Sequence, residues 1–494
     1  MKMPNTADRR HTWMTILGFA CALGFLFSVF YGGANQVAAL GTVTLERART
    51  LCVMIFMIGS FAWVVASSAS GKKRFRAFAP LVVLSLFPIT GLFVTVGFTG
   101  ELWAVIIEGA AYGVPAALLL CAWGRVLGGQ QIERSVPIAF IAAAFGAICV
   151  FVIWILIPAV DQLAFAIFPF VSVMFLNASC AFAHTEKAAS VVGGQPLPAM
   201  ESSMSDTALR LSGRIMCGTA AFGFAAGLVE AFGIASGNSQ NEQLTYALLI
   251  FTFFCLAVLQ LFGAAPLAGV KSVLPKFNEH AEDDGPIDGA YRLAILLLLG
   301  GLLAVQVLSA VGLPGETIVA AGYLGLITVL VALFLVMGAI GSGDASYVFA
   351  RGFSILFAGE VVGIIVGNAL SEWEFSAAMG VILAVAGILI AYAYLFLFTD
   401  RDLRSLSVVL EDTDTFECAC ERIIAKFALS KRESEILPLA LRGRTSERIA
   451  SEFYITKNTV DTHMRRIYSK CGVSSRQELI DLGESFQRGE RSSL

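Results

Sequence analysis

Long apolar runs alternate with short polar interruptions over the first 400 residues of this 494-residue chain. A helix needs about 20 mainly apolar residues to cross a lipid bilayer. The pattern therefore predicts twelve membrane-spanning helices. They are expected at residues 13–33, 50–69, 77–98, 102–123, 136–158, 162–183, 213–235, 244–264, 290–311, 317–340, 352–369 and 375–398.

The longest polar interruption before residue 399 divides these runs into six plus six. It covers residues 184–212 and contains Gly193-Gly194-Gln195-Pro196. We expect a cytoplasmic tail at 1–12, helices one to six within 13–183, a central cytoplasmic loop at 184–212, and helices seven to twelve within 213–398. The first run follows Lys2, Arg9 and Arg10 as a signal peptide would, but eleven further runs favour a first spanning helix.

The pattern changes after Phe398. Residues 399–428 mix charges with scattered apolar positions and predict a linker, and from Leu429 onward helix-capping signals recur. The capping residues are Ser430 with Glu433, then Gly443, Thr445, Thr456 and Gly472. Residues 429–494 are thus predicted to form a four-helix domain, and the whole chain is predicted to be all-α: a polytopic twelve-helix bundle followed by this domain.

Composition agrees with a chain that lies mostly in lipid and ends in a basic domain. Hydrophobic residues make up 57% and charged residues 14%, whereas soluble domains carry about 25% charged residues. Residues 1–400 hold 18 Lys and Arg, and 401–494 hold 16. Residues 431–476 contain ten basic and five acidic side chains. Such a surplus attracts phosphate groups.

The loop charges predict an orientation. If the amino terminus is cytoplasmic, sixteen Lys and Arg of the membrane part fall on the cytoplasmic side, and only Arg47 and Arg49 fall outside. Cytoplasmic loops are enriched in Lys and Arg. Because the number of spans is even, we expect both termini in the cytoplasm.

One stretch of the tail carries a specific resemblance. Its residues are Leu429-Ser430-Lys431-Arg432-Glu433, Gly443, Ile449-Ala450, Ile455-Thr456, Thr459-Val460, His463, Ile467-Tyr468, Lys470, Gly472-Val473, Ser475-Arg476 and Glu478-Leu479-Ile480. This pattern resembles the LuxR-type DNA-binding domain, which implies a helix-turn-helix whose later helix enters the major groove of double-stranded DNA. Arg448, Cys471 and Asp461 stand where that family commonly has Glu, Leu and Lys.

Within the expected recognition helix, positions 458, 461, 462 and 465 share one face. By analogy with related domains, the residues expected to face bases are Asn458, Asp461, Thr462 and Arg465. Arg465 could read guanine and Asp461 could read cytosine; alternatively, Asp461 is a surface residue paired with Arg465. The residues expected to contact phosphates are Lys457, Thr459, Arg466, Lys470 and Arg476.

The remaining conspicuous residues of the domain have structural interpretations. His463 has no partner in the helix and is interpreted as structural or phosphate-facing. The expected small core consists of Leu437, Ile449, Val460 and Ile467. In the last helix, Leu479, Ile480 and Leu482 either complete that core or form a two-fold contact, so that the chain binds DNA as a homodimer.

The six-plus-six plan resembles the major facilitator superfamily, whose halves surround a site at the bilayer midplane. The run Gly71-Lys72-Lys73-Arg74 is similar to the end of that family's loop signature, but the usual aspartate is missing. Ionisable groups within spans are functional candidates because their burial is unfavourable. The ligand candidates, for a small amphipathic or cationic molecule between the halves, are Glu108, Tyr112, Glu230 and Glu360. The alternative is interhelical hydrogen bonding without a ligand.

These observations favour a one-component transcriptional regulator in the bacterial inner membrane, in which the bundle senses a small molecule or a membrane signal and controls DNA binding. Two other interpretations stay open: a transporter with a regulatory DNA-binding tail, and a constitutive membrane anchor for DNA. We find no nucleophile–base pair, phosphate-binding loop or metal-ligand cluster, so neither an enzyme, a cofactor nor a metal is expected. The cysteines have no C-x-x-C pair and are expected to be reduced.

Overall fold

The computed structural model divides into two compact units, Met1–Phe182 with Ser202–Arg404 and Ala183–Glu201 with Ser405–Leu494. Each is described here by itself. The described residues are 6–31, 38–40, 43–45, 48–69, 78–97, 101–130, 132–156, 161–190, 206–232, 240–261, 286–310, 315–340, 345–371, 378–397, 416, 419–420, 422–424, 426–441, 443–453 and 455–487.

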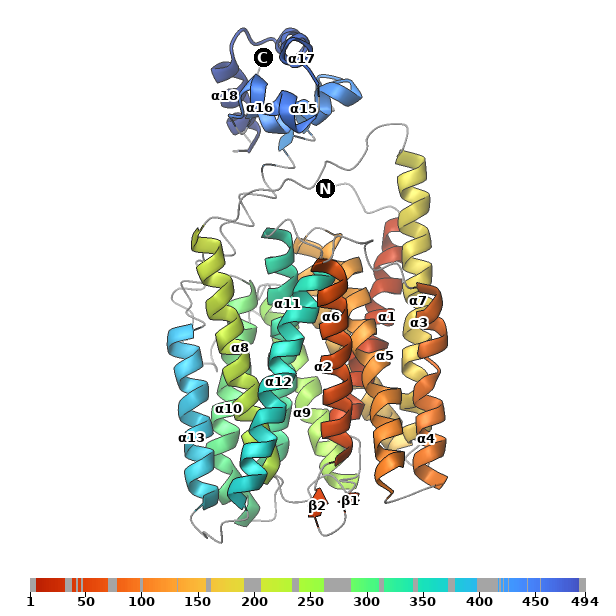
Figure 1. Cartoon of the computed structure of the whole chain (residues 1–494). Coiled ribbons are helices and arrows are strands. Elements are labelled where there is room, and N and C mark those ends of the chain that lie inside the picture. Colours follow the sequence, from red (N-terminus) through yellow and green to blue (C-terminus); the bar gives the residue numbers. More distant parts are fainter. Residues whose placement is uncertain are drawn as a thin grey trace, which may run out of the picture. The chain divides into compact units, whose positions relative to one another are not determined.

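The first unit is a bundle of long helices (Figure 1). They are α1 (Thr6–Tyr31), α2 (Ala48–Ala69), α3 (Phe78–Leu84), α4 (Phe87–Gly97), α5 (Leu102–Gly128), α6 (Ile132–Leu156), α7 (Asp161–Ser190), α8 (Asp206–Phe232), α9 (Gln240–Leu261), α10 (Pro286–Ala310), α11 (Gly315–Ile340), α12 (Ala345–Ser371) and α13 (Ala378–Tyr392), which continues as the π-helical turn η1 (Ala393–Leu397). Every predicted span coincides with a helix, and the third coincides with two. The fold class is therefore confirmed, apart from a short antiparallel pair of strands, β1 (Ala38–Leu40) and β2 (Val43–Leu45).

Two departures from the expected spans have local causes. The third span is broken between α3 and α4, because Pro88 has no N–H and its ring excludes the carbonyl of Leu84, where α3 ends. The eleventh was expected to begin at Gly352, yet α12 begins at Ala345. A Cβ on Gly352 would lie 2.3 Å from the ring of Phe334, so this glycine allows close packing rather than ending a helix.

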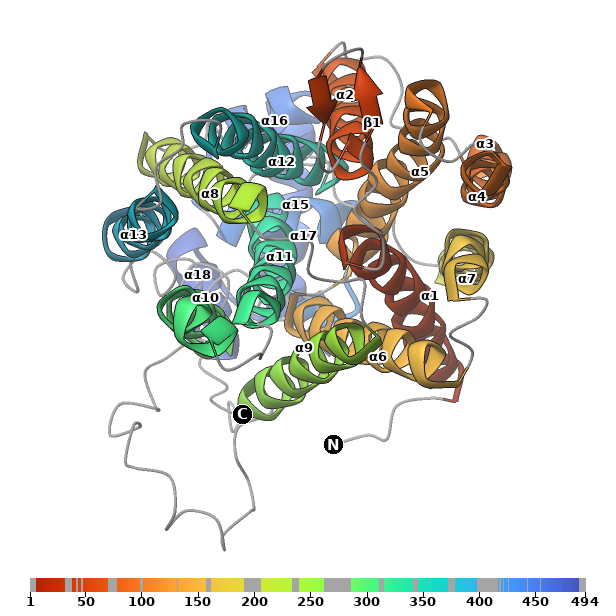
Figure 2. The same cartoon turned by 90° about the horizontal axis from the view of Figure 1, so that it is seen from below.

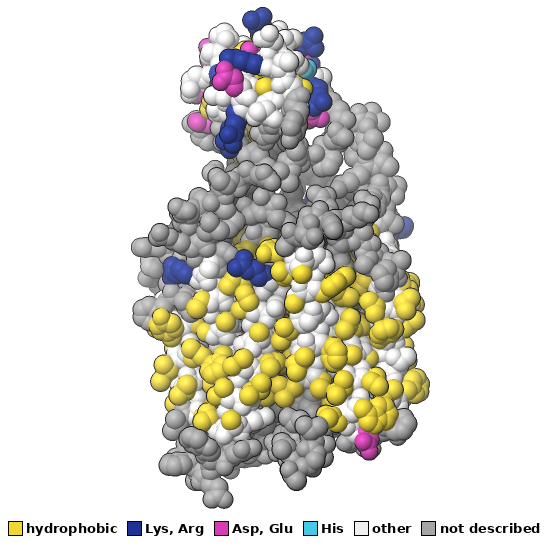
Figure 3. All heavy atoms as spheres, viewed as in Figure 1, with side chains coloured by type: hydrophobic (Ala, Val, Ile, Leu, Met, Phe, Trp, Pro, Cys, Tyr) yellow, Lys and Arg dark blue, Asp and Glu magenta, His cyan; other side chains and the backbone are white. Residues whose placement is uncertain are grey.

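The first unit has the properties of a multi-pass membrane protein. Among the described residues, eight helices are long and apolar enough to cross a membrane, and four shorter apolar helices, within Leu81–Val94, Leu248–Val258, Ala290–Ala304 and Ile382–Leu395, account for the other predicted spans. Hydrophobic side chains also cover much of the outer surface in Figure 3. Leu303 and Ile388 are among the exposed large hydrophobic residues. Lipid is the solvent that such a surface requires.

The two halves of the bundle meet where α2 packs on α12 and α6 packs on α9. Seen from the end, α11 lies inside the second half, in contact with α9, α10 and α12 (Figure 2). Phenylalanine rings line the boundary between the halves: Phe61 of α2 stacks on Phe357 of α12 with ring centroids 6.3 Å apart, and Phe30 of α1 stacks on the same ring at 5.4 Å.

Glycines set the closest helix contact of the bundle, between α8 and α12. A Cβ on Gly223 would lie 2.0 Å from the carbonyl oxygen of Leu356, and one on Gly227 would lie 2.0 Å from that of Glu360. On the opposing helix, a Cβ on Gly359 or Gly363 would lie 2.5 or 2.3 Å from carbonyl oxygens of α8. Small residues four apart allow this backbone-to-backbone packing in membranes.

Among the described residues of the second unit, four helices have defined bounds: α15 (Lys431–Leu441), α16 (Ser446–Glu452), α17 (Lys457–Cys471) and α18 (Arg476–Gln487). The side chains of Thr445 and Thr456 accept hydrogen bonds from backbone N–H groups of the helices that they cap. Gly443 and Gly472 have φ of +76° and +71°, which glycine adopts without strain. The predicted caps and the four helices are all present.

The core of this unit reaches further back along the chain than its first helix. The four predicted core residues, Leu437, Ile449, Val460 and Ile467, are all buried. Ile423 and Cys420, from the stretch expected to be linker, are buried in the same cluster, and Phe416, Ile424 and Phe427 pack against it. We call residues 416–429 the lead-in segment; 417–418, 421 and 425 within it lie outside the described residues.

Candidate functional site

Helix α17 has one buried face and one exposed face. Val460, Met464, Ile467 and Cys471 recur at helical spacing and are buried against α15 and α16. The opposite face carries polar and basic side chains. α16 and α17 are joined by a short turn in which Ile455 N–H donates to the carbonyl of Ala450, so the pair has the helix-turn-helix arrangement.

The four expected base-facing residues lie on the solvent side of α17. Asn458, Thr462 and Arg465 are exposed, and Asp461 is half-buried. The Thr462 hydroxyl donates to the carbonyl of Asn458 at 2.8 Å, so it is already engaged within the helix. In the part of the chain that the structure describes, Asp461 and Arg465 form no ion pair, which argues against the alternative in which they neutralise each other.

The five expected phosphate contacts differ in how far they are already engaged. Arg466 is exposed, and the Lys457 ammonium lies 2.7 Å from the exposed carboxylate of Glu447. Arg476, at the start of α18, is half-buried and donates to the carbonyl of Ala440 at 3.4 Å. The Thr459 hydroxyl is 2.8 Å from that of Thr456. Arg466 and Lys457 are therefore best placed to reach phosphate.

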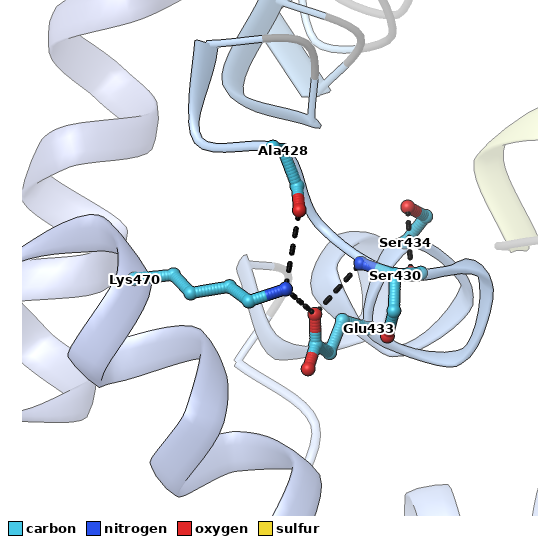
Figure 4. Close-up of polar contacts among 5 residues, drawn as sticks. All are labelled: Ala428, Ser430, Glu433, Ser434 and Lys470. Carbon is cyan, nitrogen blue, oxygen red and sulfur yellow. Dashed lines mark hydrogen bonds and ion pairs between the residues drawn. The ribbon is translucent and has the colours of Figure 1, made fainter.

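Lys470 has a different environment from the one expected. Its ammonium lies 2.7 Å from the carboxylate of Glu433 and donates to the carbonyl of Ala428 at 3.1 Å (Figure 4). Glu433 also accepts from the backbone N–H of Ser430 at 2.7 Å, as the predicted capping box requires. Burial raises the pKa of the Glu433 carboxyl, but the hydrogen bonds from Lys470 and Ser430 outweigh it, and the net pKa is lowered. The capping partner was visible in the sequence, whereas Lys470, 37 residues away, was not.

Residues that depart from the LuxR pattern fit their positions. Cys471 fills a buried place in the core, and burial raises the pKa of its thiol to about 11. Cys420 is also buried, and Cys418 lies outside the described residues. Arg448 is exposed on α16, and His463 is half-buried in α17. Among the described residues, no group of three or more His, Cys, Asp and Glu could hold a metal ion.

The last helix was expected either to complete the core or to pair two chains. Leu479 is fully buried, and Leu482 is partly buried against the same core cluster. Ile480 is half-buried and is not part of that cluster. Core packing therefore accounts for two of the three residues.

Two of the four ligand candidates form a polar cluster within the first half of the bundle. Glu108 of α5 pairs with Arg49 of α2, with Nη2 and Oε1 2.9 Å apart and both side chains buried. The Arg49 guanidinium also lies over the Tyr112 ring, 5.2 Å from its centroid. Arg49 was expected to be a loop charge. Its partner, 59 positions further along the chain, gives no local sequence signal.

The other two candidates form a second cluster within the second half. The Tyr323 hydroxyl of α11 donates to Glu360 of α12 at 2.5 Å, and Glu360 is buried. Glu230 of α8, which is half-buried, lies close enough to Glu360 to interact with it electrostatically. The four candidates thus form two separate clusters, one within each half, whereas the sequence placed them in one site between the halves.

Comparison with known proteins assigns the second unit. The family described as GerE, bacterial regulatory proteins of the luxR family, matches residues 428–482. Oxygen regulatory protein NreC from Staphylococcus aureus strains JH9 and NCTC 8325 / PS 47 is 42% identical over 53 residues. That match covers 11% of this chain and 24% of NreC, so the chain spans about a quarter of the length of these curated relatives.

A solved structure was also found over the membrane part. The crystal structure of the human organic anion transporter MFSD10 (TETRAN) aligns with 80% of this chain and 100% of its own, with a TM-score of 0.43 and 13% sequence identity. The capped helices, the exposed recognition helix and the family match all indicate a helix-turn-helix domain at the carboxy-terminal end. Residues 428–482 are therefore a LuxR-family DNA-binding domain of the helix-turn-helix type, carried by a multi-pass membrane protein.

Proposed function

We propose that this chain is a membrane-embedded one-component transcriptional regulator, whose bundle senses a small molecule or a membrane signal and controls sequence-specific DNA binding. One observation carries the proposal: a LuxR-family domain with an exposed, capped recognition helix is continuous with a multi-pass bundle that contains buried charged clusters. Buried charges in a membrane are unfavourable unless they serve packing or function.

The DNA interface is formed by the exposed side of α17. Asn458 lies in the first turn of this helix, in the half that meets base edges in helix-turn-helix proteins, and Arg465 lies near its middle. Asp461 and Thr462 lie beside them. Arg466 and Lys457 contact phosphates and fix the register without specifying sequence. The Lys457–Glu447 ion pair contributes little to stability because both side chains are exposed. Lys457 can therefore leave Glu447 and bind phosphate at little cost.

Basic residues near the starts of spans support the proposed membrane orientation. Arg134 of α6, Arg214 of α8 and Arg351 of α12 are exposed and lie within the first two turns of candidate spans, all of them odd-numbered in the predicted order, so that they begin at the same end of the bundle. Burial of Arg49 removes one of the two charges that opposed this orientation. We place this end, both termini and the DNA-binding domain in the cytoplasm, at the inner membrane.

Two copies are expected on DNA, paired through α18 with Ile480 at the contact. Most regulatory helix-turn-helix domains bind half-sites as dimers. Because Leu479 and Leu482 are used by the core, the contact must depend on Ile480 and the polar residues beside it.

DNA recognition is tested with the full chain in lipid-bilayer discs, mixed with a pool of randomised duplexes. We expect retention of an inverted repeat. Arg465→Ala should weaken binding to it by about 5- to 150-fold, since a bidentate arginine–guanine contact contributes about 1–3 kcal/mol. Arg432→Ala is the matched control, because Arg432 is an exposed arginine on α15 outside the interface. Retention that is salt-sensitive but sequence-blind would contradict sequence-specific binding.

Sensing is tested in the same discs with a lipophilic cation, tetraphenylphosphonium, as the probe. A regulator should change its affinity for the selected duplex when the cation binds, and Glu360→Gln should abolish the change. Unchanged affinity with demonstrable cation binding would favour an anchor without a switch. Cation uptake into vesicles would instead support a transporter with a regulatory tail.

A further inference from the structure

Three parts of the DNA-binding domain converge on one ammonium group. Lys470 lies in the last turn of the recognition helix α17, Glu433 lies in the first turn of α15, and Ala428 is the last residue but one of the lead-in segment. Figure 4 shows the Lys470 side chain reaching from α17 to both oxygen atoms. The recognition helix is thereby joined directly to the chain that arrives from the membrane unit.

Glu433 makes this junction obligatory. Its side chain is only 2% exposed, so its carboxylate must be satisfied within the protein. The Ser430 N–H supplies one hydrogen bond and Lys470 supplies the counter-charge. Without Lys470 the buried carboxylate would lose its ion pair, and the contact between α17, α15 and Ala428 would be lost.

Ala428 shows that the junction holds the backbone in an unfavourable conformation. Its φ of +47° lies in the left-handed region, which residues other than glycine seldom adopt. The flanking amides of Phe427 and Leu429 donate to Ile423 and Ile424, 3.0 and 3.2 Å away. The Lys470–Ala428 bond fixes the carbonyl at the point where this turn meets α15.

The lead-in segment is also held by α18. The rings of Phe427 and Phe486 have centroids 6.4 Å apart, and the Lys426 ammonium lies 5.2 Å from the Phe486 ring. Ile423 is buried between the helices. The segment therefore contacts both the recognition helix and the last helix.

We propose that Lys470 is a positioning residue for DNA binding: with Glu433 it latches the lead-in segment to the recognition helix, and release of this latch lowers DNA affinity. The latch is the route by which the membrane unit acts on α17, which rests on the proposed function. In this role Lys470 does not contact phosphate, which replaces the phosphate contact expected from the sequence.

The test compares Lys470→Met, Glu433→Gln and the matched control Arg466→Met in the full chain in lipid-bilayer discs. Amide hydrogen exchange, measured without DNA or any ligand, reports how often the lead-in segment opens. Both latch variants should speed exchange of the Phe427 and Leu429 amides at least about 10-fold relative to the amides of Val460 and Ile467. The lead-in segment can open locally while the helices that hold Val460 and Ile467 stay folded. Arg466→Met should leave these amides unchanged.

Binding to a random-sequence duplex across a salt series gives the second readout. Both latch variants should weaken binding by about 5- to 150-fold with no change in salt dependence. Arg466→Met should lower the slope of log affinity against log salt by about 0.9, as expected for one lost phosphate contact.

A phosphate-contacting Lys470 predicts the opposite pattern: Lys470→Met lowers the salt slope, while Glu433→Gln, which liberates the ammonium, leaves or improves binding. That result, unchanged exchange in either latch variant, or unfolding of the whole domain in both, would overturn the latch. None of these measurements depends on a sensed ligand or an operator, so failure of the latch is distinguishable from failure of the proposed regulator.

Discussion

Two buried carboxylates each have a charged partner on another helix. In the DNA-binding domain Glu433 is buried with a partner from another helix, and in the bundle Glu108 is buried with Arg49. A buried charge that loses its partner is strongly destabilising, whereas an exposed pair contributes little. These two carboxylates are therefore where single substitutions should have their largest electrostatic effects.

The first residue-scale prediction concerns acid. The pKa of Glu433 is lowered below its ordinary value of 4.5 in the folded domain. Its contribution to stability is therefore complete above about pH 4.5 and is lost as the pH falls through the folded-state pKa. Pulse proteolysis with pepsin in urea, on the full chain, should show the midpoint of the tail domain falling between pH 5 and pH 3. Glu433→Gln should flatten this dependence and exposed Asp481→Asn should not; equal profiles would contradict the assignment.

The second concerns the Arg49–Glu108 pair. Glu108→Gln leaves a buried guanidinium without its counter-charge and should reduce the free energy of unfolding by about 3–5 kcal/mol. Thermal unfolding of the purified chain measures this loss, with exposed Glu101→Gln, just before the same helix, as the control. Removing both charges, in Arg49→Met with Glu108→Gln, should recover part of the loss. A single variant as stable as the control would mean that the pair is not buried as the structure shows.

At the scale of elements, the seam between α8 and α12 is held by glycines that face backbone oxygens. Gly227→Ala should push the two helices apart and destabilise the bundle by about 1–3 kcal/mol, the usual effect of overpacking. Gly300→Ala is the control, since a Cβ there would meet nothing within 4 Å. The fraction of monodisperse protein after heating in detergent reports the difference. Equal heat resistance of the two variants would rule out the close approach.

Elements were predictable from the sequence where a local signal determines them. Apolar length located each spanning helix, and Ser430, Thr445, Thr456 and Gly472 located the helix ends of the DNA-binding domain. The earlier start of α12 was missed because a packing glycine and a helix-ending glycine look alike in a sequence.

The site was predictable only in part for the same reason. The exposed face of α17 follows from helical spacing within one segment, so its residues were identifiable. Glu433 with Lys470, Arg49 with Glu108, and Tyr323 with Glu360 are contacts between distant segments. The burial of Ile423 likewise depends on tertiary packing, so the sequence placed it in the predicted linker, residues 399–428. Spacing along the chain carries no information about such contacts.

For the whole molecule, the proposed orientation predicts which side of the membrane exposes the tail. Trypsin should remove the DNA-binding domain from inside-out vesicles and spare it in intact spheroplasts, since the chain has Arg401 and Arg404 just after the last span. Immunoblotting against the carboxy terminus gives the result. A periplasmic reporter fused to the amino terminus should be inactive, which checks the orientation independently of trypsin. Removal of the tail from spheroplasts would reverse the orientation.

The lead-in segment has a mechanical consequence. In the proposed function the bundle lies in lipid while the recognition helix binds DNA. Tension between the two would then pass through the lead-in segment, residues 416–429. Force applied there acts on Ile423 and on the Lys470 contact before it reaches α15 or α16. In the proposed function, a DNA site drawn away from the membrane would therefore act first on the Lys470 contact and weaken DNA binding.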